Sequence, residues 1–355
     1  MGAFIVIVCA DMSRVVDYSR ARTDVDVADL STLRDTFGTM SRVSRLARLA
    51  ARRRLSSSTD AKTIPTYGER DAFFVGATAT SGRGAYAARD VRAHDAIVSR
   101  EAPLACHRTL ANATTRCDRC LREARGGGAY CSTTCEEAAE REYAACERDA
   151  NSRELEAYCA ARGGLKFPLL VARVASKIAS GSLKQSTVDW LCFANGVERD
   201  PPPQWLEECA ALRRAFGEDS KISRDIITPA WYASVTSRLH LNSFRVEIPT
   251  TVDPSTMDFK TAVAAGLGAI ESGVASGTAI YKLPSLFNHS CAPNARASWE
   301  HGDSSMTIRA TRDIAAGEEL TIAYVDVDVD AATRRSKLSE WYGFDCACSR
   351  CVGGE

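Results

Sequence analysis

The sequence WYGFDCACSRC, residues 341–351, carries three cysteines within six residues. A closed structural zinc site needs four ligands, so this stretch requires one more from elsewhere in the chain. Cys291, in the sequence NHSC (residues 288–291), is the natural donor. A zinc ion bound by Cys291, Cys346, Cys348 and Cys351 would therefore fasten the end of the chain to this earlier segment.

This link has a consequence for several polar and aromatic side chains that are distant in sequence. It would bring Tyr342 and Phe344 close to Asn288 and His289. Tyr324 ends a further signature of the same region, GEELTIAY, and would join them. The last part of the chain is therefore predicted to assemble one polar and aromatic site.

A second cysteine group, with the spacing Cys117-x2-Cys120-x10-Cys131-x3-Cys135, suits one tetrahedral zinc ion. The alternative is four buried free cysteines, which behave as small hydrophobic residues. The neighbouring Arg, Asp, Glu and Gly residues are too polar for a core and favour the metal site. We therefore expect two zinc ions in the folded chain.

Composition limits the class of protein and its partners. The 355 residues are 45% hydrophobic and 25% charged, which is typical of a soluble globular protein. The formal net charge is zero, which favours neither nucleic acid nor an anionic membrane as partner. Residues 3–10 are apolar but fall far short of the roughly 20 residues that span a bilayer. Eight of the fourteen cysteines lie in the two groups, which indicates a reducing intracellular compartment.

The periodicity of apolar residues predicts an α+β fold. Short strands are expected between Phe73 and Cys106, and helices over residues 151–235. From Arg238 the sequence LHLNSFRVEI is strand-like, and residues 258–275 are rich in Ala and Gly. The later expectations are strands over 306–309 and 319–324, and a helix over 334–341.

The ordered set of signatures resembles the SET-domain protein lysine methyltransferases, most closely the SET-and-MYND branch. The resemblance implies a β-rich SET fold of small curved sheets with a C-terminal pseudoknot. It places the SET domain at residues 71–328, split by a MYND-like zinc module (110–150) and a helical insert (151–235). A post-SET zinc segment follows at 329–355, and residues 1–70 form a leader.

The zinc module departs from the MYND pattern, in which two zinc ions are interleaved. Residues 121–130 contain no cysteine, and Glu142 stands four residues before Cys146, where the family has histidine. The second zinc ion of the MYND finger is therefore expected to be absent. Because the module is smaller than a MYND finger, the sequence gives less support for binding of the proline-rich partners that MYND fingers recruit.

The resemblance also implies roles for individual residues. The cofactor would be S-adenosylmethionine, held by Ser81, Arg83, Asn242, Asn288, His289, Tyr324 and Phe344. Ser81 lies beside Gly82 in a Ser-Gly-Arg-Gly turn, which on its own can also be no more than a turn. Tyr324 and Tyr342 would be catalytic, because the first directs its hydroxyl at the methyl group and the second lines the lysine channel.

The implied activity is in-line methyl transfer to a deprotonated lysine of a protein substrate, histone or non-histone, by a monomeric enzyme. Two alternatives remain open at this point. The chain could be a catalytically inactive, zinc-stabilised interaction module that retains the SET shell. A DNA-binding zinc protein is the other, which the zero net charge and the lack of a recognition-helix pattern disfavour.

Residues 40–59, MSRVSRLARLAARRRLSSST, hold six arginines, five serines and no acidic residue. This composition is typical of an organellar transit peptide, and also of a solvated basic helix. If translation starts at Met40, we predict that a fluorescent fusion beginning there enters mitochondria or plastids. A fusion beginning at residue 60 is the control. Diffuse fluorescence of the Met40 fusion in cytosol and nucleus would contradict the targeting role.

Overall fold

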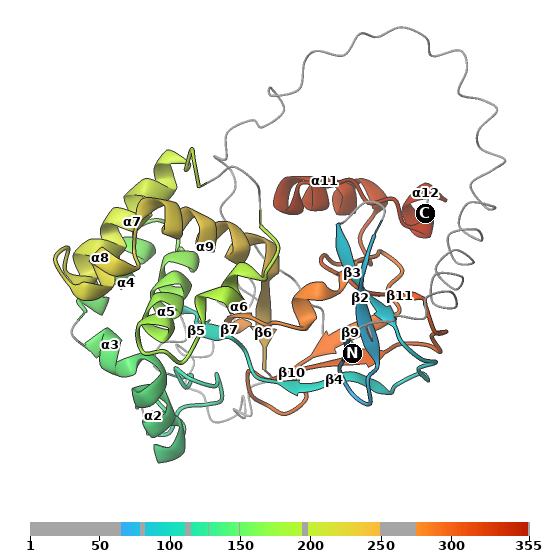
Figure 1. Cartoon of the computed structure of the whole chain (residues 1–355), viewed down its shortest axis with the longest axis horizontal. Helices are drawn as coiled ribbons and strands as arrows, with labels where there is room; N and C mark the ends of the chain where they lie inside the picture. The colour runs from blue at the N-terminus through green and yellow to red at the C-terminus, as the bar shows by residue number, and fades with distance from the viewer. Residues whose placement is uncertain are drawn as a thin grey trace, which may run out of the picture.

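The computed structural model describes residues 65–78, 82–110, 115–126, 128–148, 150–193, 198–248 and 275–353. Most helices gather on one side of the molecule and most strands on the other, with the two C-terminal helices beside the strands (Figure 1). The strands are β1 (Thr66–Tyr67), β2 (Phe73–Ala77), β3 (Arg83–Ala87), β4 (Ala96–Glu101), β5 (Ala105–Arg108), β6 (Ser243–Glu247), β7 (Ala275–Ile280), β8 (Asn288–His289), β9 (Ala295–Ser298), β10 (Met306–Ala310) and β11 (Glu319–Ile322).

The helices fall into three groups along the chain. The longest group lies between β5 and β6, and a short 3-10 turn and two C-terminal helices come later. They are α2 (Thr133–Ala139), the π-helix η3 (Glu140–Ala144), α3 (Ala145–Arg148), α4 (Ser152–Ala160), α5 (Phe167–Ala179), α6 (Gln185–Asp189), α7 (Pro203–Phe216), α8 (Lys221–Asp225), α9 (Pro229–Asn242), η5 (Pro284–Leu286), α11 (Ala331–Tyr342) and α12 (Ser349–Val352).

Within the described ranges the strands form three small sheets, with orders β1-β2-β3-β11-β8, β4-β10-β9 and β5-β7-β6. In the first sheet β2 and β3 form an antiparallel hairpin, to which β11 adds from late in the chain. β8 then pairs with β11 in parallel, with Thr321 opposite Asn288 and Ile322 opposite His289. The first sheet therefore brings the NHSC segment alongside the GEELTIAY segment.

The sheet β5-β7-β6 separates two hydrophobic cores. Successive side chains on a strand point to opposite faces. Ala279 of β7 accordingly packs into the core of the sheets, whereas Ile280 packs into the core of the helices. Helix α5, with the sequence FPLLVARVASKIA, is buried along almost its whole length and fills the second core. Burial of this apolar surface fixes the helical insert against the strands.

Most of the expected elements are confirmed, and the fold class is α+β. The four early strands, the helices between residues 152 and 242, and the helix before the terminal cysteines are all present. The expectation of a strand from Arg238 was wrong in its first half, because α9 continues to Asn242. All of its last six residues are buried or half-buried, and Leu239 belongs to the helical core, so tertiary packing sustains the helix there. Residues 258–275 lie almost wholly outside the described residues, as does the leader up to residue 64.

Two further findings concern the start of the first strand and the absence of a membrane-spanning helix from the described ranges. The first strand begins at Thr66, inside the expected leader, and pairs with β2. No helix in the described ranges is long and apolar enough to span a membrane.

Arg173 of α5 joins the cysteine module to the helical insert. Its side chain is 3% exposed and donates to Asp118 Oδ2 at 2.7 Å and to Glu147 Oε1 at 2.7 Å. The guanidinium also stacks on Tyr143, 3.5 Å from the ring centroid. Asp118 follows Cys117 directly, so this one buried cation holds the module in place from within.

We predict that Arg173→Met lowers the free energy of unfolding by about 3–5 kcal/mol, because it leaves two carboxylates without their buried counter-charge. Arg162→Met is a matched control, since the Arg162 guanidinium also stacks on a tyrosine, 3.8 Å from the Tyr158 ring, but is exposed. The control should cost about 1 kcal/mol or less. Urea denaturation measures both, and equal shifts in the midpoint would contradict the role given to Arg173.

Candidate active site and metal centres

The C-terminal cysteine group is assembled as the sequence predicts. The sulfur atoms of Cys291, Cys346, Cys348 and Cys351 all lie within 4.8 Å of one another. Cys291 Sγ is 3.5 Å from Cys351 Sγ and 4.0 Å from Cys346 Sγ. Zn–S bonds of about 2.3 Å in a tetrahedron place the sulfur atoms roughly 3.8 Å apart, so the group fits a zinc ion. The separations are far too long for disulfides, which need about 2.05 Å.

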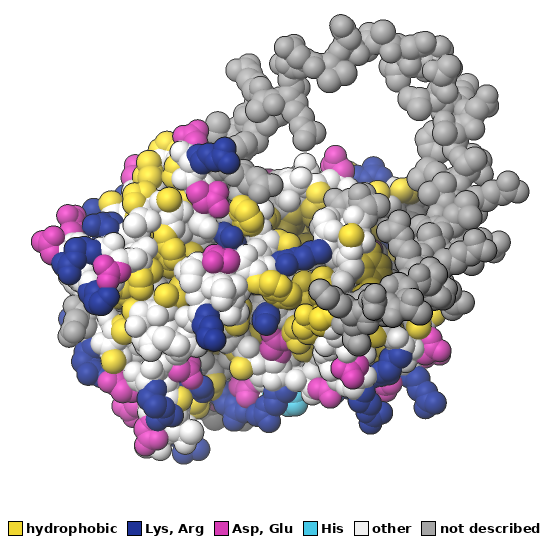
Figure 2. Space-filling model, in the orientation of Figure 1, with side chains coloured by type: hydrophobic (Ala, Val, Ile, Leu, Met, Phe, Trp, Pro, Cys, Tyr) yellow, Lys and Arg dark blue, Asp and Glu magenta, His cyan; other side chains and the backbone are white. Residues whose placement is uncertain are grey.

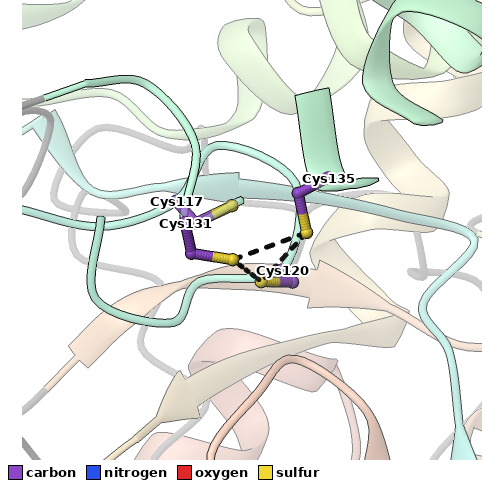
Figure 3. Close-up of side chains that lie close together, drawn as sticks. All are labelled: Cys117, Cys120, Cys131 and Cys135. Atoms are coloured by element: carbon purple, nitrogen blue, oxygen red, sulfur yellow. Dashed lines mark hydrogen bonds between the residues drawn. The ribbon is translucent and has the colours of Figure 1, made fainter. Parts of the chain in front are cut away.

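The second cysteine group has the same geometry. Figure 3 shows the side chains of Cys117, Cys120, Cys131 and Cys135 turned toward one another, with Cys135 at the start of α2. The distance between sulfur atoms is 3.5 Å for Cys120 and Cys131, 3.5 Å for Cys131 and Cys135, and 3.7 Å for Cys135 and Cys120. Both groups can therefore hold a zinc ion, and they are the two such groups within the described residues.

Two ion pairs hold Glu142, which stands where MYND fingers have a histidine ligand for their second zinc ion. Glu142 accepts hydrogen bonds from Arg119 at 2.6 Å and from Lys177 at 3.1 Å. Arg119 lies between Cys117 and Cys120, and Lys177 lies on α5. The carboxylate of Glu142 thus joins the module to the insert through two cations. This arrangement agrees with the expected loss of the second metal site.

The four aromatic side chains of the predicted site lie next to one another. The ring centroids of Tyr324 and Tyr342 are 4.9 Å apart, and those of Tyr324 and His289 are 5.4 Å apart. Phe344 lies 6.1 Å from His289 and 6.4 Å from Tyr342. The terminal cysteines position Phe344, and the adjoining α11 positions Tyr342 as its last residue. The predicted convergence of these residues is therefore present.

His289 connects the C-terminal cysteine group to Tyr324. Its Nδ1 accepts a hydrogen bond from the Tyr324 backbone N–H at 2.9 Å, and its Nε2 lies 3.3 Å from Cys291 Sγ. Because Nδ1 accepts, the ring proton belongs on Nε2 and points to the sulfur. Burial, helped by the nearby charge of Arg334, lowers the pKa of His289 to about 4. The imidazole is therefore neutral at physiological pH, and both of its nitrogens are engaged within the protein.

Asn288 occupies the gap between β3 and β11. Its Nδ2 donates to the Arg83 carbonyl oxygen at 3.1 Å and to Glu319 Oε1 at 2.9 Å. A Cβ atom on Gly84 would lie 2.6 Å from Asn288 Nδ2 and 2.8 Å from Glu319 Oε1. Gly84 is thus required for the close approach of Asn288 to β3. This contact joins the predicted residues Arg83 and Asn288, while Ser81 lies outside the described residues.

Trp190 and Cys192, which sequence reasoning missed, connect the two remaining predicted cofactor residues. The Arg83 guanidinium stacks on Trp190, 4.7 Å from the ring centroid, and donates to the Trp190 carbonyl oxygen. Asn242, at the end of α9, donates from Nδ2 to the Cys192 carbonyl oxygen at 2.8 Å. Arg83 and Asn242 therefore both hold one segment of the helical insert. The periodicity of this segment signals only a helix, so nothing in the sequence points to the contact.

The hydroxyl of Tyr324 is directed at a backbone oxygen. Its Oη donates to the Phe287 carbonyl oxygen at 2.8 Å. Burial raises the pKa of Tyr324 well above its usual value, and the nearby Cys192 and Glu319 raise it further. The phenol therefore stays protonated well above neutral pH. Two oxygen dipoles, Tyr324 Oη and Phe287 O, lie side by side at the centre of the aromatic group.

Comparison with known proteins agrees with this geometry. The family model for the SET domain matches residues 82–325. The chain belongs to the SET-domain family. Histone-lysine N-methyltransferase ATXR4 of Arabidopsis thaliana is 31% identical over 291 residues, covering 78% of this chain and 85% of that protein. A SET and MYND domain-containing protein of Dictyostelium discoideum is 26% identical over 257 residues, covering 66% and 71%.

Among solved structures, the SET domain of LSMT bound to lysine and AdoHcy aligns with 87% of this SET-domain chain. The alignment covers 58% of that longer chain, with 14% sequence identity and a TM-score of 0.33. The assignment to the SET family therefore rests on the sequence matches.

We predict that elemental analysis of the pure SET-domain protein finds two zinc ions per chain. Cys117→Ser and Cys348→Ser should each retain one, because the two cysteine groups share no ligand. The reason for two rather than three is that Glu142 is held by cations where the MYND finger binds its second metal. A value of three zinc ions in the wild type would contradict this count.

Proposed function

We propose that this chain is an S-adenosylmethionine-dependent protein lysine N-methyltransferase. The observation that carries the proposal is the environment of Tyr324. Its hydroxyl donates to the Phe287 carbonyl oxygen, and its ring lies against those of Tyr342 and His289. A methyl transfer needs positioning and oxygen dipoles more than it needs an acid or a base. Membership of the SET family and the methyltransferase named among its relatives support the same reaction.

The polar residues around Asn288 suit the cofactor. When bound, S-adenosylmethionine supplies a methyl group that is already activated on a sulfonium sulfur. In our proposal Arg83 binds its carboxylate, Asn242 and Asn288 bind its other polar groups, and Phe344 covers the adenine. Phe344 is only partly buried, so part of its side chain is accessible to a ligand.

The tyrosines suit the substrate. Tyr342 and Tyr324 would enclose the apolar stem of a lysine and exclude water from its amine. The amine lone pair forms the new N–C bond as the C–S bond breaks, which leaves a neutral thioether and a methylated ammonium. Tyr324 Oη and Phe287 O would orient the methyl group with their partial negative charges. The amine has lost one proton to solvent before the transfer, and no residue of the described site is assigned as its base.

The proposed partner is a protein that presents a lysine, histone or non-histone, and the proposed enzyme is a monomer. On the described part of the face in Figure 2, basic and acidic side chains are interspersed rather than gathered by sign. Nucleic-acid binding commonly uses a continuous basic stripe, so this face favours a protein partner over DNA. A catalytically inactive interaction module is the remaining alternative, and methyl transfer by the wild-type protein separates the enzyme from it.

We predict that the rate of methyl transfer rises about tenfold per pH unit between pH 7 and pH 9, because the substrate lysine, with a reference pKa of about 10.4, must be neutral. Tyr324 does not reverse this trend, since its pKa is raised above the usual value and its phenol stays neutral over this range. Single-turnover rates with a saturating cofactor measure the profile. A flat profile would show that deprotonation of the substrate does not limit the reaction.

We predict that Tyr324→Phe lowers kcat by about 100-fold or more, in the range seen when one preorganised polar group is lost. The change removes one oxygen, so zinc content and cofactor binding should change little. Tyr232→Phe is the control, because it also removes a buried hydroxyl, one that donates to Glu208 in the helical core. The control should lose stability and keep its rate. Near wild-type methylation by Tyr324→Phe would favour a different catalytic residue.

A further inference from the structure

Arg334 is the largest fully buried side chain of the described residues, and it lies on the first turns of α11 with 1% of its surface exposed. Its guanidinium donates to the Val329 carbonyl oxygen, and it lies close enough to the sulfur atoms of Cys291 and Cys351 to interact with both. These two cysteines are the most buried of the C-terminal group, at 1% and 2% exposure. An arginine thus lies against the closed side of the candidate zinc site.

The charge of the site explains why an arginine can be covered at this position. A covered cation is unfavourable unless an opposite charge lies close to it. A Zn²⁺ ion with four cysteine thiolates carries a net charge of −2. The sulfur atoms that Arg334 contacts belong to this charged group when the metal is bound, and the group is lost when the metal leaves.

Two other arginines surround the same cysteines but contact the backbone. Arg350 donates to the carbonyl oxygens of Val327, at 2.7 Å, and Cys291, at 3.4 Å. Arg335 donates to the Cys351 carbonyl oxygen, and its side chain is exposed. Arg334 differs from both because its contacts reach the ligand atoms themselves. Arg335 therefore offers a matched neighbour on the same helix.

We infer that Arg334 is the counter-charge of the zinc–thiolate group and makes docking of residues 343–353 onto the NHSC segment depend on bound metal. The inference rests on the proposal that Cys291, Cys346, Cys348 and Cys351 bind zinc. Without the metal, Arg334 stays covered but the zinc–thiolate group beside it is gone, and the docked C-terminal segment loses this stabilising interaction. Zinc, Arg334 and the position of Phe344 are then linked in one equilibrium.

The kinetics of zinc release test the inference. Excess chelator is added to wild-type, Arg334→Gln, Arg334→Lys and Arg335→Gln proteins, and a chromophoric chelator reports the metal released. We expect Arg334→Gln to release one of its two zinc ions about 10–100 times faster than the wild type, the range for loss of an outer partner of a metal ligand. The other zinc ion is an internal control for folding and should leave at the wild-type rate. Arg335→Gln should match the wild type.

Arg334→Lys separates charge from shape, because it keeps the cation and loses the planar fork. The inference is supported if Arg334→Lys releases zinc at a rate closer to that of the wild type than to that of Arg334→Gln. Equal release from the Lys and Gln variants, or wild-type release from Arg334→Gln, would overturn it. A wild type that holds no zinc at this group would overturn the zinc proposal itself and the inference with it.

A second readout is the change in melting temperature when the metal is removed. The wild type should lose more stability on chelation than Arg334→Gln does, because only the wild type loses the interaction between a covered guanidinium and the zinc–thiolate group. If Arg334 only fills space, chelation should lower the melting temperature of the wild type and of Arg334→Gln by the same amount. If Arg334→Gln does not fold, Arg334→Lys keeps the inference falsifiable: because it retains the cation, it should release its zinc ions within a few-fold of Arg335→Gln, and release about 10–100 times faster would overturn the role of the charge.

Discussion

The contact between Cys291 and the terminal Cys346, Cys348 and Cys351 is the constraint on which the candidate active site depends. It closes a loop between the NHSC segment and the end of the chain, and so places Phe344 and Tyr342 beside His289 and Tyr324. His289 extends this constraint inward, since it contacts Cys291 Sγ on one side and the Tyr324 backbone on the other. A zinc ion here would thus help to position the Tyr324 hydroxyl, through His289, without contacting that hydroxyl directly.

The other half of the site depends on the helical insert. Arg83 from β3 and Asn242 from α9 both hold the segment around Trp190 and Cys192. The insert is in turn fixed by its apolar helix α5 and by the covered Arg173, which reaches the cysteine module. Among the described residues, the cysteine module contacts the insert through Arg173, and it contacts the sheets through Leu121 and the Arg122–Asp303 ion pair. The terminal cysteines instead pack against Tyr324, Tyr342 and Phe344, so the two metal groups are expected to differ in their effect on cofactor binding.

Much of the site could be predicted from the sequence because its ligands follow local rules. The spacing of cysteines reflects the tetrahedral geometry of zinc, and the sets 117–135 and 291–351 are both assembled as expected. The position of Arg334 could not be predicted, because ATRRSKLSE has the composition of a solvated helix face and burial depends on tertiary packing. The contact of Trp190 with Arg83 also could not be predicted, because the periodicity of a helix does not show which strand its end packs against. The predicted boundary between α9 and β6 was wrong for the same reason, because the apolar residues of LHLN are compatible with either a helix or a strand.

The most direct test of this account is the affinity for S-adenosylhomocysteine of Cys348→Ser compared with Cys117→Ser, measured by isothermal titration calorimetry. The account predicts no measurable binding by Cys348→Ser, because Phe344 and the Tyr342 side of the site are released from His289. It predicts an affinity close to that of the wild type for Cys117→Ser, whose cysteine group lies in the separate module. Wild-type affinity in Cys348→Ser would contradict the central role given to the C-terminal cysteine group.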